Sequence, residues 1–201
     1  MSSTNRANSQ ERHIADYYFT PIPAIEDFFR EWLNDMKDVE DFLSVGHQAE
    51  KMVWLDPCAG GDEKHPMSYP KFIEENLGGK VETIDIREDS LAEVKGDYLL
   101  MDMPHEYDII ITNPPFNIAQ QIIEKAMKDV QEGGYVIMLL RLNYLGSQQR
   151  KAFWEKYPPQ RIYVHRKRMT FQDNGGTDSI EYMHCVWQKG ELSKEALLRI
   201  I

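Results

Sequence analysis

The sequence has 201 residues, 42% of them hydrophobic and 28% charged, with a formal net charge of −10, which is the composition of a soluble globular domain. No run approaches the ~18 consecutive apolar residues of a membrane-spanning helix, and the polar residues 1–14 lack the apolar core of a signal peptide and predict a flexible tail. Two cysteines, Cys58 and Cys185, and scattered histidines exclude a disulfide framework and predict no metal site, so we expect reduced thiols and a cytoplasmic protein.

The hydrophobic pattern alternates between helices and strands over residues 15–201, which we expect to form a single domain. Helical spacing covers 24–36, 69–77, 118–130 and 148–157, and apolar runs typical of buried strands cover 52–55, 81–86, 109–112 and 135–140. Two later runs, 161–165 and 181–188, predict further strands, the second antiparallel. The pair Gly133-Gly134 is expected to end the helix over 118–130, and another helical pattern begins at Ser193. The alternation predicts an α/β fold with a mostly parallel twisted sheet, helices on both faces, and ligands beyond the carboxyl ends of the strands.

The most informative motif, Asn113-Pro114-Pro115-Phe116, directly follows the strand expected at 109–112. The nitrogen of an aromatic amine is a poor nucleophile because its lone pair is delocalised into the ring. The side-chain oxygen of Asn113 and the carbonyl of Pro114 can accept its two N–H bonds and turn the lone pair towards an electrophile. Phe116 can stack on the ring and stabilise the positive charge that develops there. We therefore predict that Asn113, Pro114 and Phe116 are catalytic.

Three further segments at or beyond strand ends suit a nucleoside cofactor. Glycine in Asp56-Pro57-Cys58-Ala59-Gly60 lets the backbone approach a ligand closely. Asp85, followed by Ile86, stands where an acid commonly binds ribose hydroxyls, with an ordinary strand-end carboxylate as the alternative. Asp97-Tyr98 offers a carboxylate for an adenine amine and a ring to stack on the adenine, and Asp102 competes for the first role. The predicted cofactor-binding residues here are Asp56, Pro57, Ala59, Gly60, Asp85, Ile86, Asp97 and Tyr98.

Positive charge is concentrated in one segment of an otherwise acidic chain. Residues 141–170 have a balance of +7, whereas the remaining residues carry −17. A charge run is more often a solvated face than a binding site, so the asymmetry by itself identifies no ligand. It is compatible with a basic, nucleic-acid-binding face on an acidic body.

Taken together, these motifs resemble those of the DNA amino-methyltransferases, specifically the adenine-modifying branch, over roughly residues 16–190. In that family the tetrapeptide begins with Asn, Asp or Ser, continues Pro-Pro and ends in an aromatic residue, which Asn113 to Phe116 match. The run from Asp16 to Pro21 is similar to the family's N-terminal cofactor motif, which adds Thr20 and Pro21 to the expected cofactor site and gives the gamma order of motifs. The resemblance implies a Rossmann-like methyltransferase fold of the phage or bacterial type, with S-adenosyl-L-methionine as cofactor. It also implies direct methyl transfer to the exocyclic amine of a flipped adenine in DNA, as in restriction-modification systems.

On the substrate side, residues 168–171 followed by 175–178 resemble the segment that supplies a second aromatic ring against the extruded base. Phe171 is the candidate, with a core phenylalanine as the alternative, and Arg166 and Arg168 become candidate phosphate contacts. Asp62 stands where the family's loop often has another glycine. A separate target-recognition domain does not fit after Gly190, so we expect minimal recognition loops, or a protein partner or second copy that supplies recognition.

Three other functions stay open at this point. A protein glutamine methyltransferase uses a similar tetrapeptide because an amide nitrogen has the same delocalised lone pair, although such enzymes carry an N-terminal helical domain. An RNA adenine methyltransferase would present the same pocket to a flipped adenine. A non-catalytic decoy on the same fold would have no need of the amine-orienting Asn113.

Overall fold

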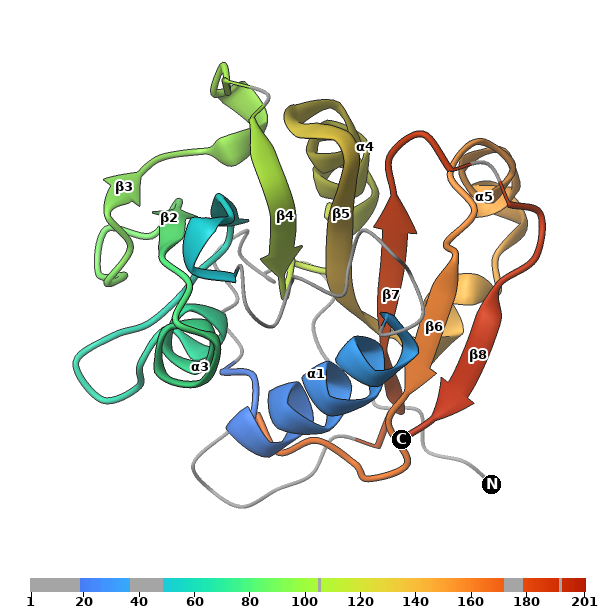
Figure 1. The fold of residues 1–201 in the computed structure, drawn as a ribbon, viewed down its shortest axis with the longest axis horizontal. Helices are drawn as coiled ribbons and strands as arrows, with labels where there is room; N and C mark the ends of the chain where they lie inside the picture. Colours follow the sequence, from blue (N-terminus) through green and yellow to red (C-terminus); the bar gives the residue numbers. More distant parts are fainter. Residues whose placement is uncertain (1–18, 37–48, 105, 172–178, 192) are drawn as a thin grey trace, which may run out of the picture.

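The computed structural model describes residues 19–36, 49–104, 106–171, 179–191 and 193–201, and its centre is an eight-stranded sheet (Figure 1). In spatial order the strands are β3 (Val94–Lys95), β2 (Val81–Asp85), β1 (Trp54–Asp56), β4 (Tyr107–Thr112), β5 (Val130–Arg141), β7 (Tyr182–Gln188), β6 (Arg161–Val164) and β8 (Leu197–Ile200). β7 runs antiparallel to both of its neighbours, and every other pair of adjacent strands is parallel.

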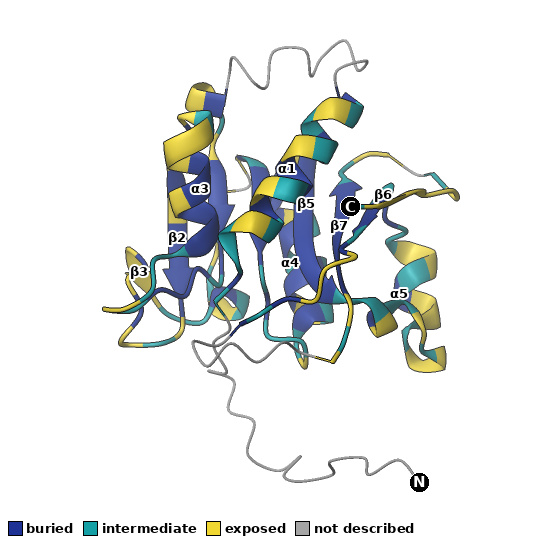
Figure 2. Ribbon diagram, turned by 90° about the horizontal axis from the view of Figure 1, so that it is seen from below, coloured by how far each residue is buried: buried dark blue, intermediate teal, exposed yellow. Residues whose placement is uncertain are grey.

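Helices cover both faces of the sheet, because alternate residues of each strand point to opposite sides and are apolar on both. Helices α1 (Ile22–Met36) and α3 (Ser68–Leu77) pack on one face, in a cluster that includes Tyr135 and Ile137 of β5. Helices α4 (Ala119–Asp129) and α5 (Lys151–Lys156) pack on the other, in a cluster that includes Val136 and Met138. The central strands of the sheet are accordingly buried between two helical layers, whereas the edge strands β3 and β8 are exposed (Figure 2).

The carboxyl ends of the parallel strands meet at a single edge of the sheet. β7 runs antiparallel to both β5 and β6, so β6 runs parallel to β5. β8 is parallel to β6, and both strands therefore end at this same edge. The strand order also reverses between β1 and β4, and in open α/β sheets such a reversal leaves a crevice beyond the carboxyl ends. Asp56, Asp85, Thr112 and Arg141 each end a strand here.

The α/β architecture and its antiparallel strand near the end of the chain are confirmed, but two local expectations were wrong. The segment after Ser193 is not helical: β8 pairs with β6 in parallel, because the edge of β6 offers backbone groups that Leu197 N–H and Ile201 N–H bind. Gly133-Gly134 does not end a helix, since α4 already ends at Asp129 and both glycines lie within β5. Gly133 has φ +81°, which suits the irregular register between β4 and β5.

Among the described residues, no helix is both long and apolar enough to cross a membrane.

Candidate active site

A cleft at the carboxyl edge of the sheet, with about 760 Å³ of empty space including its open mouth, brings most of the sequence-predicted site residues together. Its lining includes Thr20, Asp56, Pro57, Ala59, Asp85, Ile86, Asp97, Tyr98 and Asn113. Most of these residues end or follow β1, β2 and β4, whereas Asp97 and Tyr98 follow β3 and Thr20 precedes α1. The cleft therefore lies where the reversal of strand order predicts a ligand site.

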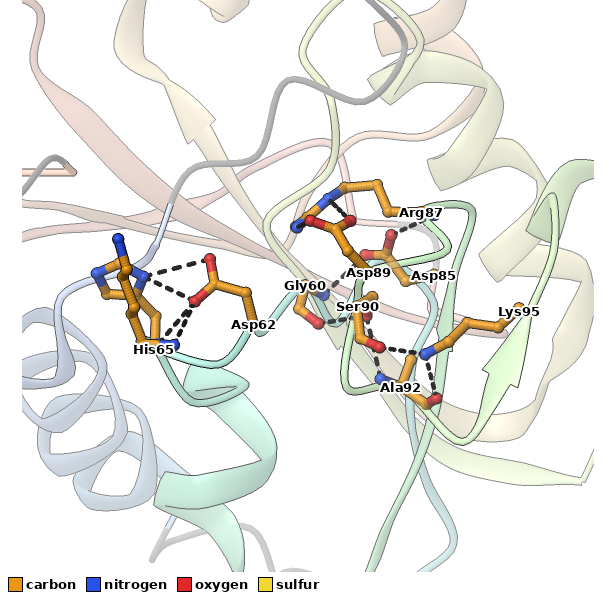
Figure 3. A network of polar contacts seen from close by, with 10 residues as sticks. Gly60, Asp62, His65, Asp85, Arg87, Asp89, Ser90, Ala92 and Lys95 are labelled. Carbon is orange, nitrogen blue, oxygen red and sulfur yellow. Dashed lines mark hydrogen bonds and ion pairs between the residues drawn. The ribbon is translucent and has the colours of Figure 1, made fainter.

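The loop after β1 is held by the carboxylate of Asp85 (Figure 3). Gly60 N–H donates to Asp85 Oδ2 at 2.8 Å, and the Ser90 hydroxyl donates to the Gly60 carbonyl. Asp85 Oδ1 accepts from Arg87 N–H, also at 2.8 Å. Gly60 has φ +65°, a conformation that favours glycine. Asp85 is thus a cleft residue that also sets the shape of the neighbouring loop.

Asp62, which stands where a glycine is common in the resembling family, closes a turn of its own. Its Oδ1 accepts from the backbone N–H groups of Lys64 and His65, both at 2.8 Å (Figure 3). These bonds hold the pKa of Asp62 below its usual value, with the His65 ring also close. The departure from glycine is therefore accommodated by an aspartate-capped turn.

Asp56 ends β1 in a buried position, with 1% of its surface exposed. Burial raises its pKa to about 7, against the opposing effect of the Cys58 N–H, which donates to Oδ1 at 3.2 Å. A positively charged ligand beside Asp56 would stabilise the ionised carboxylate and so offset the cost of burying its charge.

Asp97 and Tyr98 begin the short 3-10 helix Tyr98–Leu100, and their side chains have separate tasks. Asp97 caps this helix, accepting from Leu99 N–H at 2.9 Å, and lines the cleft. The Tyr98 hydroxyl donates to Asp129 at 2.7 Å, and Lys125 lies over its ring at 4.8 Å while pairing with Asp129. These contacts with Asp129 and Lys125 hold the Tyr98 ring in place. Asp102, the competitor of Asp97, is exposed and lies outside the cleft lining.

Asn113 follows β4 and is bonded to the segment that begins α1. Its Nδ2 donates to Thr20 Oγ1 at 3.1 Å, although 93 residues separate the two. Pro21, next to Thr20, lies outside the lining and accepts at its carbonyl from Ala24 and Ile25, which starts α1. An amide held through its nitrogen offers its oxygen as the acceptor for a substrate N–H.

Phe116 and Phe171 lie outside the cleft lining but in one apolar cluster, with Leu139, Met169 and Tyr182. Both rings contact Tyr182, with centroid distances of 5.9 Å for Phe116 and 4.7 Å for Phe171. The guanidinium of Arg141 lies 4.7 Å from the centre of the Phe116 ring. Phe171 is buried and lies in the same cluster as Phe116, where its ring packs against other apolar side chains. Pro114 is buried in the same loop, and Pro115 lines the cleft.

Arg166 and Arg168 are exposed just beyond the end of β6, at the same edge of the sheet as the cleft. Arg168 lies 4.0 Å from Glu181. The expected segments 16–18 and 175–178 lie outside the described residues.

The sequence reasoning missed several cleft residues, among them Ser68, Tyr69, Gly96, Ile118 and Ile122. Ile118 and Ile122 are four apart at the start of α4, a spacing that also describes ordinary core packing. Tyr69 lies on the buried face of α3 and carries no signal in the sequence that distinguishes it from a core aromatic residue.

No family model matches the sequence, and no curated protein matches it, but solved structures share its fold. A proposed class I S-adenosylmethionine-dependent methyltransferase from Listeria monocytogenes aligns with a TM-score of 0.61 and 16% identity, over 91% of this chain and 65% of that one. The methyltransferase subunit of a type I restriction-modification system from Streptococcus thermophilus gives 0.63 and 11%, over 91% and 47%. An S-adenosylmethionine-dependent O-methyltransferase from Thermotoga maritima gives 0.56 and 16%, over 90% and 70%. The chain therefore has the Rossmann-like methyltransferase fold and spans less than two thirds of the first two proteins.

Proposed function

We propose that this protein binds S-adenosyl-L-methionine and transfers its methyl group to the exocyclic amine of a flipped adenine in DNA. The observation that carries the proposal is the position of Asn113, which follows β4 in the wall of a cleft that also contains Asp56, Asp85 and Asp97. An amine-orienting amide and a set of nucleoside-binding carboxylates thus share one cavity.

The donors and acceptors of the cleft fit this cofactor. Asp85 suits the ribose hydroxyls, Asp97 suits the adenine amine, and Tyr98 with Ile86 supplies apolar surface for the ring. Asp56 and Thr20, which line the same cleft, suit the positively charged methionine end. Three carboxylates around one cavity attract a cationic ligand and repel an anionic one.

The cofactor supplies an activated methyl group, and the residues of this chain orient the acceptor. Asn113 accepts an N–H of the amine through Oδ1, with the carbonyl of Pro114 as the second acceptor, so that the nitrogen lone pair turns towards the methyl. The proton of the methylated amine leaves to water, because the positive charge makes that nitrogen acidic. Phe116 stabilises the same developing charge through its ring face.

DNA is favoured as the substrate by the exposed arginines that follow β6 at the carboxyl edge of the sheet and by the structural similarity to a restriction-modification methyltransferase subunit. Arg166 and Arg168 lie at the edge that a flipped nucleotide would approach, where they can contact flanking phosphates. The same proposal includes a protein partner or second copy that supplies target recognition. It also includes a role in a bacterial or phage-infected cell.

The test is transfer of radiolabelled methyl from S-adenosylmethionine to unmodified DNA, RNA and protein, followed by digestion to identify the product. Methylated adenine recovered from DNA supports the proposal. Label found only in RNA adenine or protein glutamine would identify RNA or protein, in place of DNA, as the substrate. Cofactor binding without transfer to any of the three indicates a decoy.

A matched pair of variants ties any transfer to the proposed site. Asn113→Ala should abolish transfer and leave the Kd for the cofactor nearly unchanged. Asn76→Ala makes the same chemical change on α3, where the side chain donates to Phe72 O, and should retain transfer. Near-normal turnover in Asn113→Ala would sink the mechanism.

A further inference from the structure

One face of helix α4 leads from the cleft to a pair of buried charges. Ile118 and Ile122 line the cleft where this helix begins. Lys125 and Asp129 follow at three- and four-residue spacing, so all four side chains lie on the same face. The first half of this face is apolar and borders the ligand site, whereas the second half carries two opposite charges. Charges on the inward face of a helix are costly unless each one is paired.

Both charges contact Tyr98, which lies in the wall of the cleft. The Tyr98 hydroxyl donates to Asp129 Oδ2 at 2.7 Å, and Lys125 Nζ lies 2.9 Å from the same oxygen. Lys125 Nζ also lies 4.8 Å from the centre of the Tyr98 ring. The three side chains therefore contact one another in pairs, and the ring is held both at its hydroxyl and over its face.

This cluster of Tyr98, Lys125 and Asp129 is largely closed to water. Tyr98 is 3% exposed and Asp129 is 1%, and the side chain of Lys125 is 17% exposed. Burial and the bond to Asp129 raise the pKa of Tyr98 far above its usual value, so the hydroxyl stays protonated and remains a donor. A shift of the ring would weaken the compensation of a buried carboxylate, which opposes such a shift.

The position of Tyr98 also affects its neighbours in the chain. Tyr98 begins the 3-10 helix Tyr98–Leu100, which Asp97 caps by accepting from Leu99 N–H at 2.9 Å. Asp97, Tyr98 and Leu99 all line the cleft, whereas Lys125 and Asp129 lie outside its lining. The proposed function assigns the adenine of the cofactor to Asp97 and Tyr98. Any effect of the two charges on that ligand therefore passes through Tyr98.

We propose that Asp129 and Lys125 are positioning residues for the cofactor, which hold the Tyr98 ring and the short helix it begins in the geometry that accepts adenine. The proposal rests on the cofactor site of the proposed function and is independent of the methyl acceptor. It gives a role to two residues of α4 that no motif in the sequence identified.

Tyr98→Phe is the decisive variant, because it removes the bond to Asp129 and keeps the aromatic ring. We expect S-adenosylhomocysteine to bind about five- to ten-fold more weakly by calorimetry, since a preorganised contact surface becomes mobile. Adenosine, measured as a competitor, should lose affinity by the same factor, because the affected contact is with the adenine end. Wild-type affinity in a folded Tyr98→Phe protein would overturn the proposal.

Tyr107→Phe is the matched control. The Tyr107 hydroxyl donates to a carboxylate in the same way, to Glu82 Oε2 at 2.8 Å, and Tyr107 is buried in the same apolar cluster as Tyr98. Neither Tyr107 nor Glu82 lines the cleft. Both variants should lower Tm, but only Tyr98→Phe should weaken cofactor binding. Equal losses of cofactor affinity would indicate a general loosening of the core and would overturn the positioning role.

A double-mutant cycle locates the effect in the contact between Tyr98 and Asp129. Asp129→Ala should weaken binding of S-adenosylhomocysteine about as much as Tyr98→Phe, and the double variant should bind no more weakly than the weaker single variant. Two losses that multiply would show independent roles and contradict the proposal. Asp129→Asn keeps an oxygen that can accept from Tyr98 and should bind more tightly than Asp129→Ala. If Asp129→Ala does not fold, Lys125→Met replaces it in the cycle, with the same expected non-additivity.

Failure of this proposal and failure of the proposed function give different results. A protein that binds S-adenosylhomocysteine, responds to Tyr98→Phe and methylates nothing would refute the proposed transfer and leave the positioning role standing. A protein that methylates adenine in DNA and keeps its cofactor affinity in Tyr98→Phe would support the proposed function and overturn the positioning role. A wild-type protein without affinity for S-adenosylhomocysteine would overturn both.

Discussion

The carboxylate of Asp85 binds the backbone N–H of Gly60 at 2.8 Å, so the end of β2 determines the shape of the loop that follows β1. The same carboxylate accepts from Arg87 N–H and lines the cleft. One side chain thus couples loop geometry to the ligand site.

Asp85→Asn should weaken both the loop contacts and ligand binding. The new NH₂ group is a hydrogen-bond donor and would face one of the two backbone N–H donors that the carboxylate accepts from. We expect S-adenosylhomocysteine to bind at least ten-fold more weakly by calorimetry, and the free energy of unfolding to fall by about 1–3 kcal/mol. Asp89→Asn is the control: it makes the same change on a side chain that is 73% exposed and pairs with Arg87. Equal cofactor affinity in the two variants would argue against a ligand role for Asp85.

The position of Phe116 outside the cleft lining predicts a split between catalysis and cofactor binding. Phe116→Ala should reduce kcat by about ten- to a hundred-fold, since the ring is expected to stabilise charge on the substrate. Its effect on the cofactor Kd should stay within two-fold. Phe116→Tyr, which keeps an aromatic ring, should retain most of the activity. Steady-state kinetics with DNA checks both variants, and a Phe116→Ala enzyme that loses affinity and not kcat would contradict the assignment.

Much of the cleft was predictable because its residues come directly after short apolar strands. Asp56, Asp85 and Asn113 stand at strand ends, and parallel strands necessarily bring such ends together. The strand β8 was not predictable from spacing, because Leu197, Leu198 and Ile201 also fit a helix, and the unpaired edge of β6 decides between the two.

The buried contact between Tyr69 and His184 was unpredictable for a different reason. Tyr69 and His184 occupy core positions in α3 and β7, and 115 residues separate them in the sequence. Their contact depends on how α3 and β7 pack with α1, whose Phe28 ring stacks on His184, and no local pattern encodes this packing. Phe171 is similar, since only the tertiary structure places it beside Phe116 in contact with Tyr182.

Asp56 should make the folded protein less stable as the pH rises towards neutrality. Its pKa is about 7 when folded and near 3.8 when unfolded, so between these values the folded state keeps a proton that the unfolded state has released. Between pH 5 and pH 8 this group should therefore remove about 2–3 kcal/mol of stability.

His165, with its pKa lowered to about 4, has the opposite effect: its contribution is lost as the pH falls through 6.5 towards 4. The Asp56→Asn variant retains His165, so the contribution of this histidine cancels when the free energies of unfolding of variant and wild type are compared. The remaining pH dependence is that of Asp56. Urea denaturation of both proteins without cofactor at pH 5 and pH 8 should show the variant gaining relative to wild type at pH 8. Parallel pH profiles would contradict the raised pKa of the buried Asp56 carboxyl group.

The exposed arginines beyond β6 predict a specific salt dependence of DNA binding. Each phosphate contact made by a cation contributes about one unit to the slope of log K against log salt concentration. Arg166→Ala combined with Arg168→Ala should therefore weaken binding of a DNA duplex and reduce this slope by about two units. Fluorescence anisotropy between about 50 and 200 mM salt measures both quantities.

The matched control for this pair is Lys151→Ala combined with Lys156→Ala, which removes the same charge from α5. That helix leads into the amino end of β6, at the edge of the sheet opposite the cleft (Figure 1). If long-range attraction by net charge were responsible, both double variants would weaken binding equally, whereas direct contacts require the effect to be confined to Arg166 and Arg168. Equal slopes in the two double variants would therefore remove the basic edge from the DNA-binding face, and the +7 segment would be a solvated surface.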